Sequence, residues 1–307
     1  MHSFSFKIFY ADLKSRLFWQ RCAQVMRLNA PIGWILLALP GFWGYAWSCP
    51  RGSYSTLLWI ILGAIWARSM GCFYNDWVDR GIDGRVERTR NRPLVASRPS
   101  YSMLIIMTSI VLLGAVFFIG LLPWPCTVLA ALGGAGAAVY PWAKRWMDYP
   151  QVILALIFNL AVWMPAWIEN VPISNGLWIL YAYGILWTLG YDTVYAFQDW
   201  KDDCSLGVGS LAVKLGHQKG WYLLGGLIVW RFSMLGLLIG YTQGSVKSLS
   251  TPVYSMMLLG MMSVQLWKWY FLDVTNAHMC HQYFRACYKE GYWTAVWVLL
   301  LAGGVFI

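Results

Sequence analysis

The chain has 307 residues, of which 59% are hydrophobic and only 12% are charged. Soluble domains contain about 45–50% apolar and about 25% charged residues, so this composition excludes an ordinary soluble protein and indicates a polytopic membrane protein. The net charge of +10 would suggest a nucleic-acid partner in a soluble chain. In a membrane chain the excess of Lys and Arg is better explained by the membrane surface. We therefore expect a lipid bilayer around the protein and no nucleic-acid partner.

The N-terminal segment, residues 1–29, combines five Lys and Arg residues with Phe, Trp and Tyr. It lacks the apolar core and the small-residue cleavage site of a signal peptide. Mixed basic and aromatic side chains are typical of an amphipathic helix that lies in the membrane interface. We predict an interfacial segment at 1–29, followed by a single membrane domain at 30–307.

Apolar stretches follow, each close to the length of about 20 residues that a membrane-spanning helix needs. They lie at residues 31–47, 54–74, 101–122, 124–141, 152–168, 176–197, 221–241, 251–271 and 291–307. The break between the third and fourth stretches rests on Pro123 and Pro125, which disfavour a continuous helix. The sequence thus predicts an all-α fold, a polytopic bundle of nine transmembrane helices.

The distribution of Lys and Arg predicts which loops face the cytoplasm. Of the 23 such residues, 18 lie in the N-terminal segment and in the loops after even-numbered spans, whereas the opposite loops contain only Arg51 and Lys247. The positive-inside rule assigns the basic face to the cytoplasm. We expect a multi-pass protein of a bacterial inner membrane, with an active-site cavity that faces the cytoplasm.

The second span ends in a cluster of carboxylates. Asn75, Asp79 and Asp83 follow one another at intervals of four residues, so a continuous helix would place them on one face. Arg68 falls on the same face, and Asp76 lies beside it. Like charges at this spacing destabilise a helix, more so where water is scarce. A bound cation would relieve the repulsion.

The end of the sixth span repeats this arrangement. Asp192, Asp199 and Asp203 are separated by seven and four residues and leave the membrane on the same side as the first cluster. Two such helix ends could face each other across a cavity and give each Mg²⁺ one or two carboxylates, leaving its other positions to water and phosphate oxygens. Basic side chains on this face, above all Arg88 and Lys144, would stabilise charge that develops on a diphosphate. The pattern is typical of a site that holds a diphosphate through metal.

These motifs resemble those of the UbiA family of intramembrane aromatic prenyltransferases. Residues 75–83 are similar to the first family motif, N-D-x-x-D-x-x-x-D, and residues 192–203 to the second, D-x-x-Y-A-x-x-D-x-x-x-D, in which Tyr195 is the tyrosine. Smaller similarities are Arg27 followed by Pro31-Ile32-Gly33 and a Y-x-x-x-K element formed by Tyr140 and Lys144. The resemblance extends from about residue 27 to the last span.

The resemblance implies an activity and its partners. The expected reaction transfers a polyprenyl chain from polyprenyl diphosphate to the ring of 4-hydroxybenzoate, ortho to the hydroxyl, and releases diphosphate, as in ubiquinone synthesis. Mg²⁺ is the implied cofactor, and no obligatory protein partner is implied. Tyr140 and Lys144 are implied to contact the diphosphate, and Arg145 and Asp192 to hold the aromatic acid. Consecutive residues on a helix point about 100° apart, so Lys144 and Arg145 can serve different ligands.

The expected site residues form two groups. The expected catalytic carboxylates are the six members of the two clusters, namely Asp76, Asp79, Asp83, Asp192, Asp199 and Asp203. All of them except Asp192 are also expected to be metal ligands. The expected substrate-binding residues are Arg27, Arg68, Asn75, Arg88, Tyr140, Lys144, Arg145 and Tyr195.

The sequence departs from the family pattern at three places. Asn29-Ala30 lacks an acidic-basic pair, Trp200-Lys201 stands where Arg-Asp is common, and Gly209-Ser210 stands where Lys-Ser is usual. The missing Lys is expected to weaken diphosphate contact or acceptor specificity.

Other interpretations remain open at this level. A naphthoate, homogentisate or haem would fit the same motifs as prenyl acceptor, and intramembrane carboxylates also occur in ion-coupled transporters. The His and Cys residues between 276 and 287 have no common metal-ligand spacing, and we expect a surface loop there.

Overall fold

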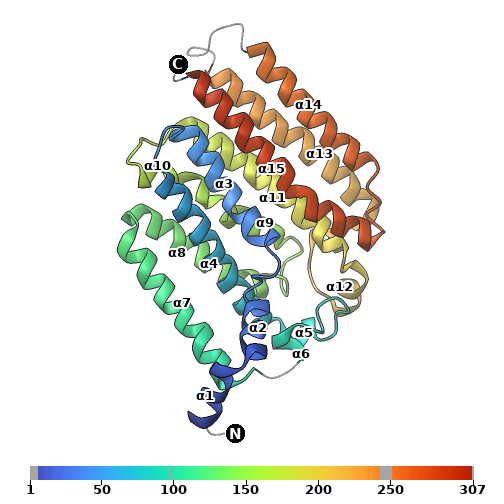
Figure 1. The fold of residues 1–307 in the computed structure, drawn as a ribbon. Coiled ribbons are helices and arrows are strands. Elements are labelled where there is room, and N and C mark those ends of the chain that lie inside the picture. The colour runs from blue at the N-terminus through green and yellow to red at the C-terminus, as the bar shows by residue number, and fades with distance from the viewer. Residues whose placement is uncertain (1–5, 97–98, 243–250, 306–307) are drawn as a thin grey trace.

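The computed structural model describes residues 6–96, 99–242 and 251–305, and every regular element within these ranges is a helix. Long helices run alongside one another, and several short helices lie toward the end of the bundle that holds the N-terminus (Figure 1). The expected all-α fold is confirmed.

Each predicted span corresponds to helical structure. The segments are α3 (Ile32–Ser48), α4 (Tyr54–Val78), α7 (Tyr101–Leu121), α8 (Trp124–Ala143), α9 (Gln151–Phe158) continued by η1 (Asn159–Trp163) and α10 (Met164–Ile168), α11 (Asn175–Phe197), α13 (Leu211–Thr242), α14 (Thr251–Tyr270) and α15 (Ala277–Val305). Within the described residues, five stretches are long and apolar enough to cross a membrane, namely α4, α7, α8, residues 151–168 and α13. The chain is an integral membrane protein.

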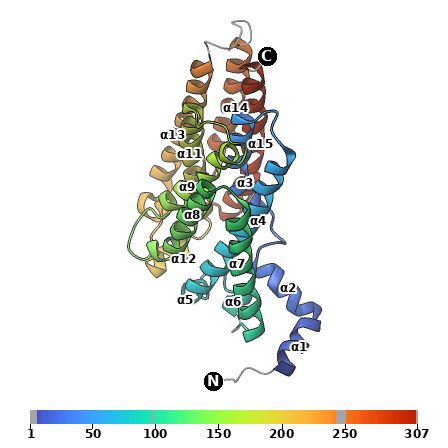
Figure 2. The same cartoon turned by 90° about the vertical axis from the view of Figure 1, so that its left-hand side faces the viewer.

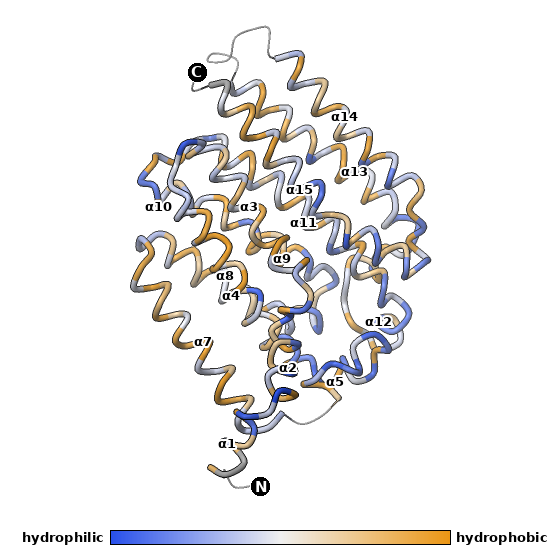
Figure 3. The backbone as a smooth tube through the Cα atoms, viewed as in Figure 1, coloured by the Kyte–Doolittle hydropathy of each residue, from blue (hydrophilic) through white to orange (hydrophobic). Residues whose placement is uncertain are grey.

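The surface of the long helices is apolar. On α7, Leu112, Leu113 and Val116 are 60–70% exposed, which in a membrane places them against lipid. Hydrophobic residues dominate the long helices, whereas hydrophilic ones concentrate around α5 and α12 (Figure 3). Polar chemistry is therefore concentrated toward one end of the bundle.

Short helices connect the long ones at that end. They are α1 (Phe6–Lys14), α2 (Arg16–Val25), α5 (Arg80–Asp83), α6 (Pro93–Ala96) and α12 (Trp200–Leu206). The predicted interfacial helix is thus two helices in its described part, separated at Ser15, whose hydroxyl accepts a hydrogen bond from the Phe18 N–H. Figure 2 shows α1 and α2 projecting from the bundle. Residues 1–5 and Lys247 lie outside the described residues.

Several predicted boundaries were correct and others were wrong. The proline break is confirmed, because α7 ends at Leu121 and Pro123 precedes α8. The seventh span begins ten residues earlier than predicted and kinks at Gly216, whose φ of 66° suits only glycine well.

The predicted surface loop at 276–287 is wrong, because α15 begins at Ala277. The side chain of Asn276 starts that helix by accepting the N–H groups of His278 and Met279.

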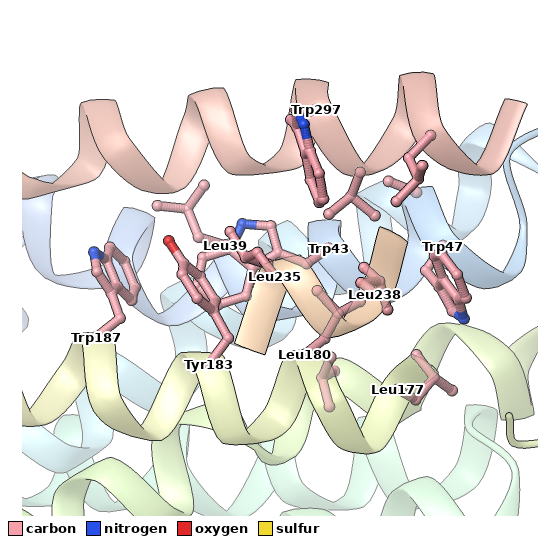
Figure 4. Packing of buried hydrophobic residues seen from close by; sticks show 14 of the residues in the cluster. Leu39, Trp43, Trp47, Leu177, Leu180, Tyr183, Trp187, Leu235, Leu238 and Trp297 are labelled. Atoms are coloured by element: carbon pink, nitrogen blue, oxygen red, sulfur yellow. The ribbon is translucent and has the colours of Figure 1, made fainter. Parts of the chain in front are cut away.

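The core lies between α3, α11, α13 and α15. Trp43, Tyr183, Trp187 and Trp297 are almost fully buried there and interlock between the helices (Figure 4). The Trp43 indole N–H donates to the Gly291 carbonyl at 2.8 Å. A buried ion pair between Arg231 and Glu290, at 2.7 Å, joins α13 to α15 within this core. Aromatic packing, this hydrogen bond and this ion pair therefore hold the helices of the core together.

All seven cysteines lie in described segments and are free thiols.

Candidate active site

One cavity of about 780 Å³ passes between α4, α8, α9 and α11. It is lined by all six predicted carboxylates and by every predicted substrate-binding residue except Arg145. Residues that are 127 positions apart in the sequence, Asp76 and Asp203, therefore share one chamber. The expectation that the two clusters face each other across a cavity is confirmed.

The first carboxylate cluster (Asp76, Asp79 and Asp83) does not occupy one continuous helix, contrary to the prediction. Helix α4 ends at Val78, and α5 begins at Arg80 after a turn at Asp79. Arg92 stabilises this turn by pairing with a carboxylate on each side of it. Its Nη1 lies 2.9 Å from Asp76 Oδ1 and 2.8 Å from Asp83 Oδ2. One guanidinium thus draws together two carboxylates on different helices.

Arg27 reaches the same cluster from the N-terminal segment. Its Nη2 lies 2.6 Å from Asp76 Oδ2. Its φ is 55°, which is uncommon for a residue other than glycine. The backbone turns here because α2 has just ended, and the Leu28 N–H donates back to the Ala23 carbonyl at 3.0 Å. Backbone strain of this kind often accompanies functional side chains.

Lys144 approaches Asp79 from the end of α8. Its Nζ lies 3.2 Å from Asp79 Oδ2 and 4.8 Å from the centre of the Tyr140 ring. The other Asp79 oxygen, Oδ1, is buried and accepts no hydrogen bond from the described residues. Arg145 Nη2 is 3.6 Å from that oxygen. A carboxylate oxygen left in this state is available to a cation.

The second carboxylate cluster (Asp192, Asp199 and Asp203) is also divided between helices. Helix α11 ends at Phe197, and Asp199 precedes α12, so the predicted single helix face is wrong here as well. Asp199 forms a two-pronged ion pair with Arg88, whose Nη1 also donates to the Tyr195 hydroxyl at 2.7 Å. Burial, followed by the negative charge of Asp199, raises the pKa of Asp203 to about 7.

The segment after the first cluster reaches across to the second. Besides the Arg88 contacts, the Glu87 N–H donates to Asp202 at 3.1 Å. Arg88 follows Asp83 by only five residues. The residues that follow the first cluster therefore contact the second cluster directly.

Arg68 lies deeper in the cavity and is unusual in having no carboxylate partner among the described residues. Its Nε is buried without a hydrogen bond, and Tyr191, Asp192 and Tyr195 line the same chamber. The guanidinium packs directly on Gly33 of α3, where a Cβ would overlap Nε. An unpaired guanidinium in low dielectric is costly, and such a group is well suited to bind an anionic ligand.

Arg145 differs from its neighbour. It is absent from the cavity lining, its side chain is 39% exposed, and its Nη2 donates to the Val78 carbonyl at 3.0 Å. Only Lys144 lines the cavity, but both side chains reach Asp79, so the expectation that they point in different directions is not confirmed. A contact between Arg145 and the aromatic acid stays a prediction.

Two cavity residues were missed as site residues. Arg92 lies in the segment between α5 and α6, and nothing in its local sequence distinguishes it from Arg85 or Arg90. Tyr191 lines the chamber with its hydroxyl buried and unpartnered. Its position next to Asp192 was the available signal.

The carboxylates suit a hard cation in their chemistry. No group of three His, Cys, Asp or Glu side chains in the described residues is gathered closely enough to hold a metal ion. Arg or Lys side chains pair with Asp76, Asp79, Asp83 and Asp199. Asp79 Oδ1 nevertheless lacks a hydrogen-bond donor, and Asp203 has no ion pair within the described part. Mg²⁺ needs only one or two carboxylates when phosphate oxygens and water complete its shell. The donor set therefore fits Mg²⁺ with a diphosphate.

These features define a class of membrane protein: a helical bundle with a partly apolar chamber that is lined by carboxylates. Residues 37–289 match the model of the UbiA prenyltransferase family, and the chain belongs to this family.

Curated relatives share this sequence to different extents. The 4-hydroxybenzoate octaprenyltransferase of Blochmanniella pennsylvanica is 32% identical over 91% of this chain and 95% of its own length. The enzyme with the same name from Pseudomonas fluorescens strain SBW25 is 40% identical, over 63% of this chain and 66% of its own length. The higher identity thus applies to about two thirds of each sequence.

Solved structures show the same fold. A UbiA homolog from Archaeoglobus fulgidus bound to GPP and Mg²⁺ superposes with a TM-score of 0.68 at 14% identity, covering 91% of this chain and 99% of that one. The apo structure of a UbiA homolog from Aeropyrum pernix K1 gives 0.59 at 22% identity, covering 81% and 95%.

Proposed function

We propose that this membrane enzyme transfers a polyprenyl chain from its diphosphate to 4-hydroxybenzoate, ortho to the hydroxyl, with release of diphosphate. The family and the relatives named for this reaction support the proposal. The observation that carries it is the single chamber that joins two carboxylate clusters, several cations and an apolar wall. A site for an anionic head, a metal and a lipid tail has this composition.

The diphosphate end would be held by the two clusters. Asp76, Asp79 and Asp83 on one side, with Asp199 and Asp203 on the other, would hold Mg²⁺, which when bound supplies Lewis acidity to the leaving diphosphate. Lys144 and Arg88 already reach these carboxylates, so a short movement brings their N–H groups to phosphate oxygens. Their charge would then stabilise the negative charge left when the carbon–oxygen bond breaks.

The prenyl chain would occupy the apolar part of the cavity. On α4 the lining extends from Asp76 back to Trp59, which are 17 positions apart. At 1.5 Å per residue this distance is about 25 Å along the helix. Phe118, Leu122 and Ile168 line the same region. These side chains would exclude water from the allylic cation, which water would otherwise quench.

The aromatic acid would lie between the two regions. The unpaired Arg68 guanidinium can bind the acceptor carboxylate through two parallel hydrogen bonds. Asp192, which forms no ion pair in the described residues, lies 3.5 Å from the Tyr140 hydroxyl. It would accept the proton that the ring loses after the ortho carbon attacks. Electrophile, ring and base would then share one chamber.

We further propose nine spans, with both clusters on the cytoplasmic side. The support is the positive-inside distribution of Lys and Arg. Residues 1–29 would lie in the interface, where the exposed Phe6, Tyr10 and Trp19 suit the headgroup region. The rest, residues 30–307, would form one domain.

A transport function has less support. The interrupted stretch at residues 151–168 is the kind of broken helix found in transporters. The buried polar residue at the break, Asn159, donates through its amide nitrogen to the Ala155 carbonyl and the Thr188 hydroxyl, while its Oδ1 accepts no hydrogen bond from the described residues. The carboxylates lie instead at helix ends among Arg and Lys.

The test is a transfer assay with the purified protein. Labelled polyprenyl diphosphate, Mg²⁺ and each acceptor in turn, namely 4-hydroxybenzoate, a dihydroxynaphthoate, homogentisate and haem, are incubated and the lipid products are separated. We expect prenylated 4-hydroxybenzoate, lost when EDTA removes the metal. A product formed only with another acceptor would refute the acceptor, and no product with any would refute the activity.

A further inference from the structure

Gly209 lies where the family commonly has Lys, and the structure gives a reason for glycine at this position. Its N–H donates to the Lys144 carbonyl at 2.8 Å. A Cβ at this position would overlap the Met147 carbonyl oxygen and lie 3.2 Å from the Lys144 carbonyl oxygen. The backbone after α12 therefore rests directly on the turn that follows Lys144, and only glycine permits this approach.

Two further contacts join the same segments. The Leu211 N–H donates to Gln151 Oε1 at 3.1 Å, and Gln151 is almost fully buried. Lys214 Nζ lies 2.6 Å from Asp148 Oδ2, although both side chains are half exposed. An exposed ion pair contributes little, so the Gly209 and Gln151 hydrogen bonds carry most of the connection.

This connection links the segment that contacts the first carboxylate cluster to the segment that follows the second. Lys144 belongs to the wall that contacts Asp79. Gly209 follows Asp203 by six residues, and the Val208 N–H donates back to the Asp203 carbonyl at 3.0 Å. The spacing between the Lys144 ammonium and the second carboxylate cluster thus depends on the contact at Gly209.

Within the proposed prenyl transfer, on which this inference rests, we propose that Gly209 is a positioning residue that holds Lys144 toward the diphosphate. The departure from the family pattern is then an adaptation of this chain, in which backbone contact replaces a side chain. A Lys at 209 would not restore a missing phosphate contact. It would displace the turn that carries Lys144.

Steady-state kinetics of Gly209→Ala and Gly209→Lys test this. We expect both to raise KM for polyprenyl diphosphate by about tenfold, because small displacements of a positioning group are costly, while KM for 4-hydroxybenzoate stays within about twofold. Gly226→Ala is the matched control, since no heavy atom lies within 4 Å of a Cβ there and the residue is outside the cavity lining. Higher activity in Gly209→Lys, or equal behaviour of Gly209→Ala and Gly226→Ala, would overturn the inference.

A double-mutant cycle separates positioning from a general loss of structure. If Gly209 acts through Lys144, Gly209→Ala adds little to KM for the diphosphate in a Lys144→Ala background. Additive effects would overturn the inference. Gln151→Met loosens the same segment without adding an atom at 209 and should reproduce the effect if Gly209→Ala fails to accumulate in the membrane.

Binding of inorganic diphosphate with Mg²⁺, measured as thermal stabilisation of the purified protein, gives a readout independent of transfer. We expect less stabilisation of Gly209→Ala than of Gly226→Ala. If the wild-type protein shows no transfer but the two variants still differ in stabilisation, the proposed acceptor chemistry is refuted and the positioning role is supported. Equal stabilisation of the two variants would overturn the positioning role even in an active enzyme.

Discussion

Replacing Arg68 is the most direct test of how the acceptor is held. The guanidinium lines the chamber beside Asp192 and has a buried Nε that no described residue satisfies. Hydrogen bonds to charged groups contribute about 1.5–3 kcal/mol. At about 1.4 kcal/mol per tenfold change, Arg68→Met should lower kcat/KM for 4-hydroxybenzoate by about 10- to 150-fold.

The same variant should leave the protein folded. Removing one member of a buried ion pair leaves an isolated charge and costs several kcal/mol, but Arg68 has no such partner in the described residues. The apolar Met side chain fits beside Gly33 and Cys72, which also line this part of the cavity. We expect the amount of protein in the membrane and its thermal midpoint to change little.

The assay varies each substrate in turn. Arg68→Met should raise KM for the acceptor and leave KM for polyprenyl diphosphate within about twofold, and Arg68→Lys should recover only part of the loss because an ammonium cannot form two parallel hydrogen bonds. Arg85→Met is the matched control, because Arg85 is exposed and lies outside the cavity lining. An unchanged acceptor constant in Arg68→Met, or a larger effect of Arg145→Met, would refute the assignment and return Arg145 to the acceptor site.

Three further predictions follow from the same geometry. Asp199→Asn should reduce transfer at least about 100-fold without loss of the protein from the membrane, since amides bind Mg²⁺ poorly and ligand-shell changes cost this much; substantial turnover would remove Asp199 from the metal site. Arg92→Gln removes the cation that Asp76 and Asp83 share. It should raise the Mg²⁺ concentration needed for half-maximal activity, or the KM for polyprenyl diphosphate, by about tenfold. Unchanged values of both would show that Arg92 is dispensable. Cysteines introduced at positions 87 and 206 should both react with an impermeant reagent only from the cytoplasmic side, whereas labelling from opposite sides would contradict the paired clusters.

The sequence predicted the class of fold and the membership of the site well, because both depend on local patterns. Apolar stretches of bilayer length identified the helices, and Pro123 marked a true break. The carboxylate motifs lie at helix ends that the distribution of basic residues places on one side. Thirteen of the fourteen expected site residues line one chamber.

Details that depend on tertiary contacts could not be predicted. Spacing alone favoured a continuous helix through Asp83, but the chain turns at Asp79, and Arg92 pairs with carboxylates on both sides of the turn. Arg27, from the N-terminal segment, adds a second ion pair to Asp76. The same limit explains why Arg92 was missed, since its function is visible only when two carboxylates meet it. From the sequence, Gly209 was interpreted as the loss of a Lys side chain. The structure shows instead that the backbone of residues 144–147 packs against it and leaves no room for a Cβ.

The ion pairs of the chamber also suggest how its charge is balanced during the reaction. Arg27, Arg92 and Lys144 form ion pairs with the first cluster, and Arg88 pairs with Asp199. Unpaired charges in a low-dielectric interior cost several kcal/mol each. In the proposed reaction, a diphosphate bound together with Mg²⁺ would bring both signs of charge, so Arg and Lys could turn to phosphate oxygens while the carboxylates hold the metal. Each such exchange would replace one ion pair with another, so the site could bind and release a highly charged group within a membrane without isolating the carboxylates that are now paired.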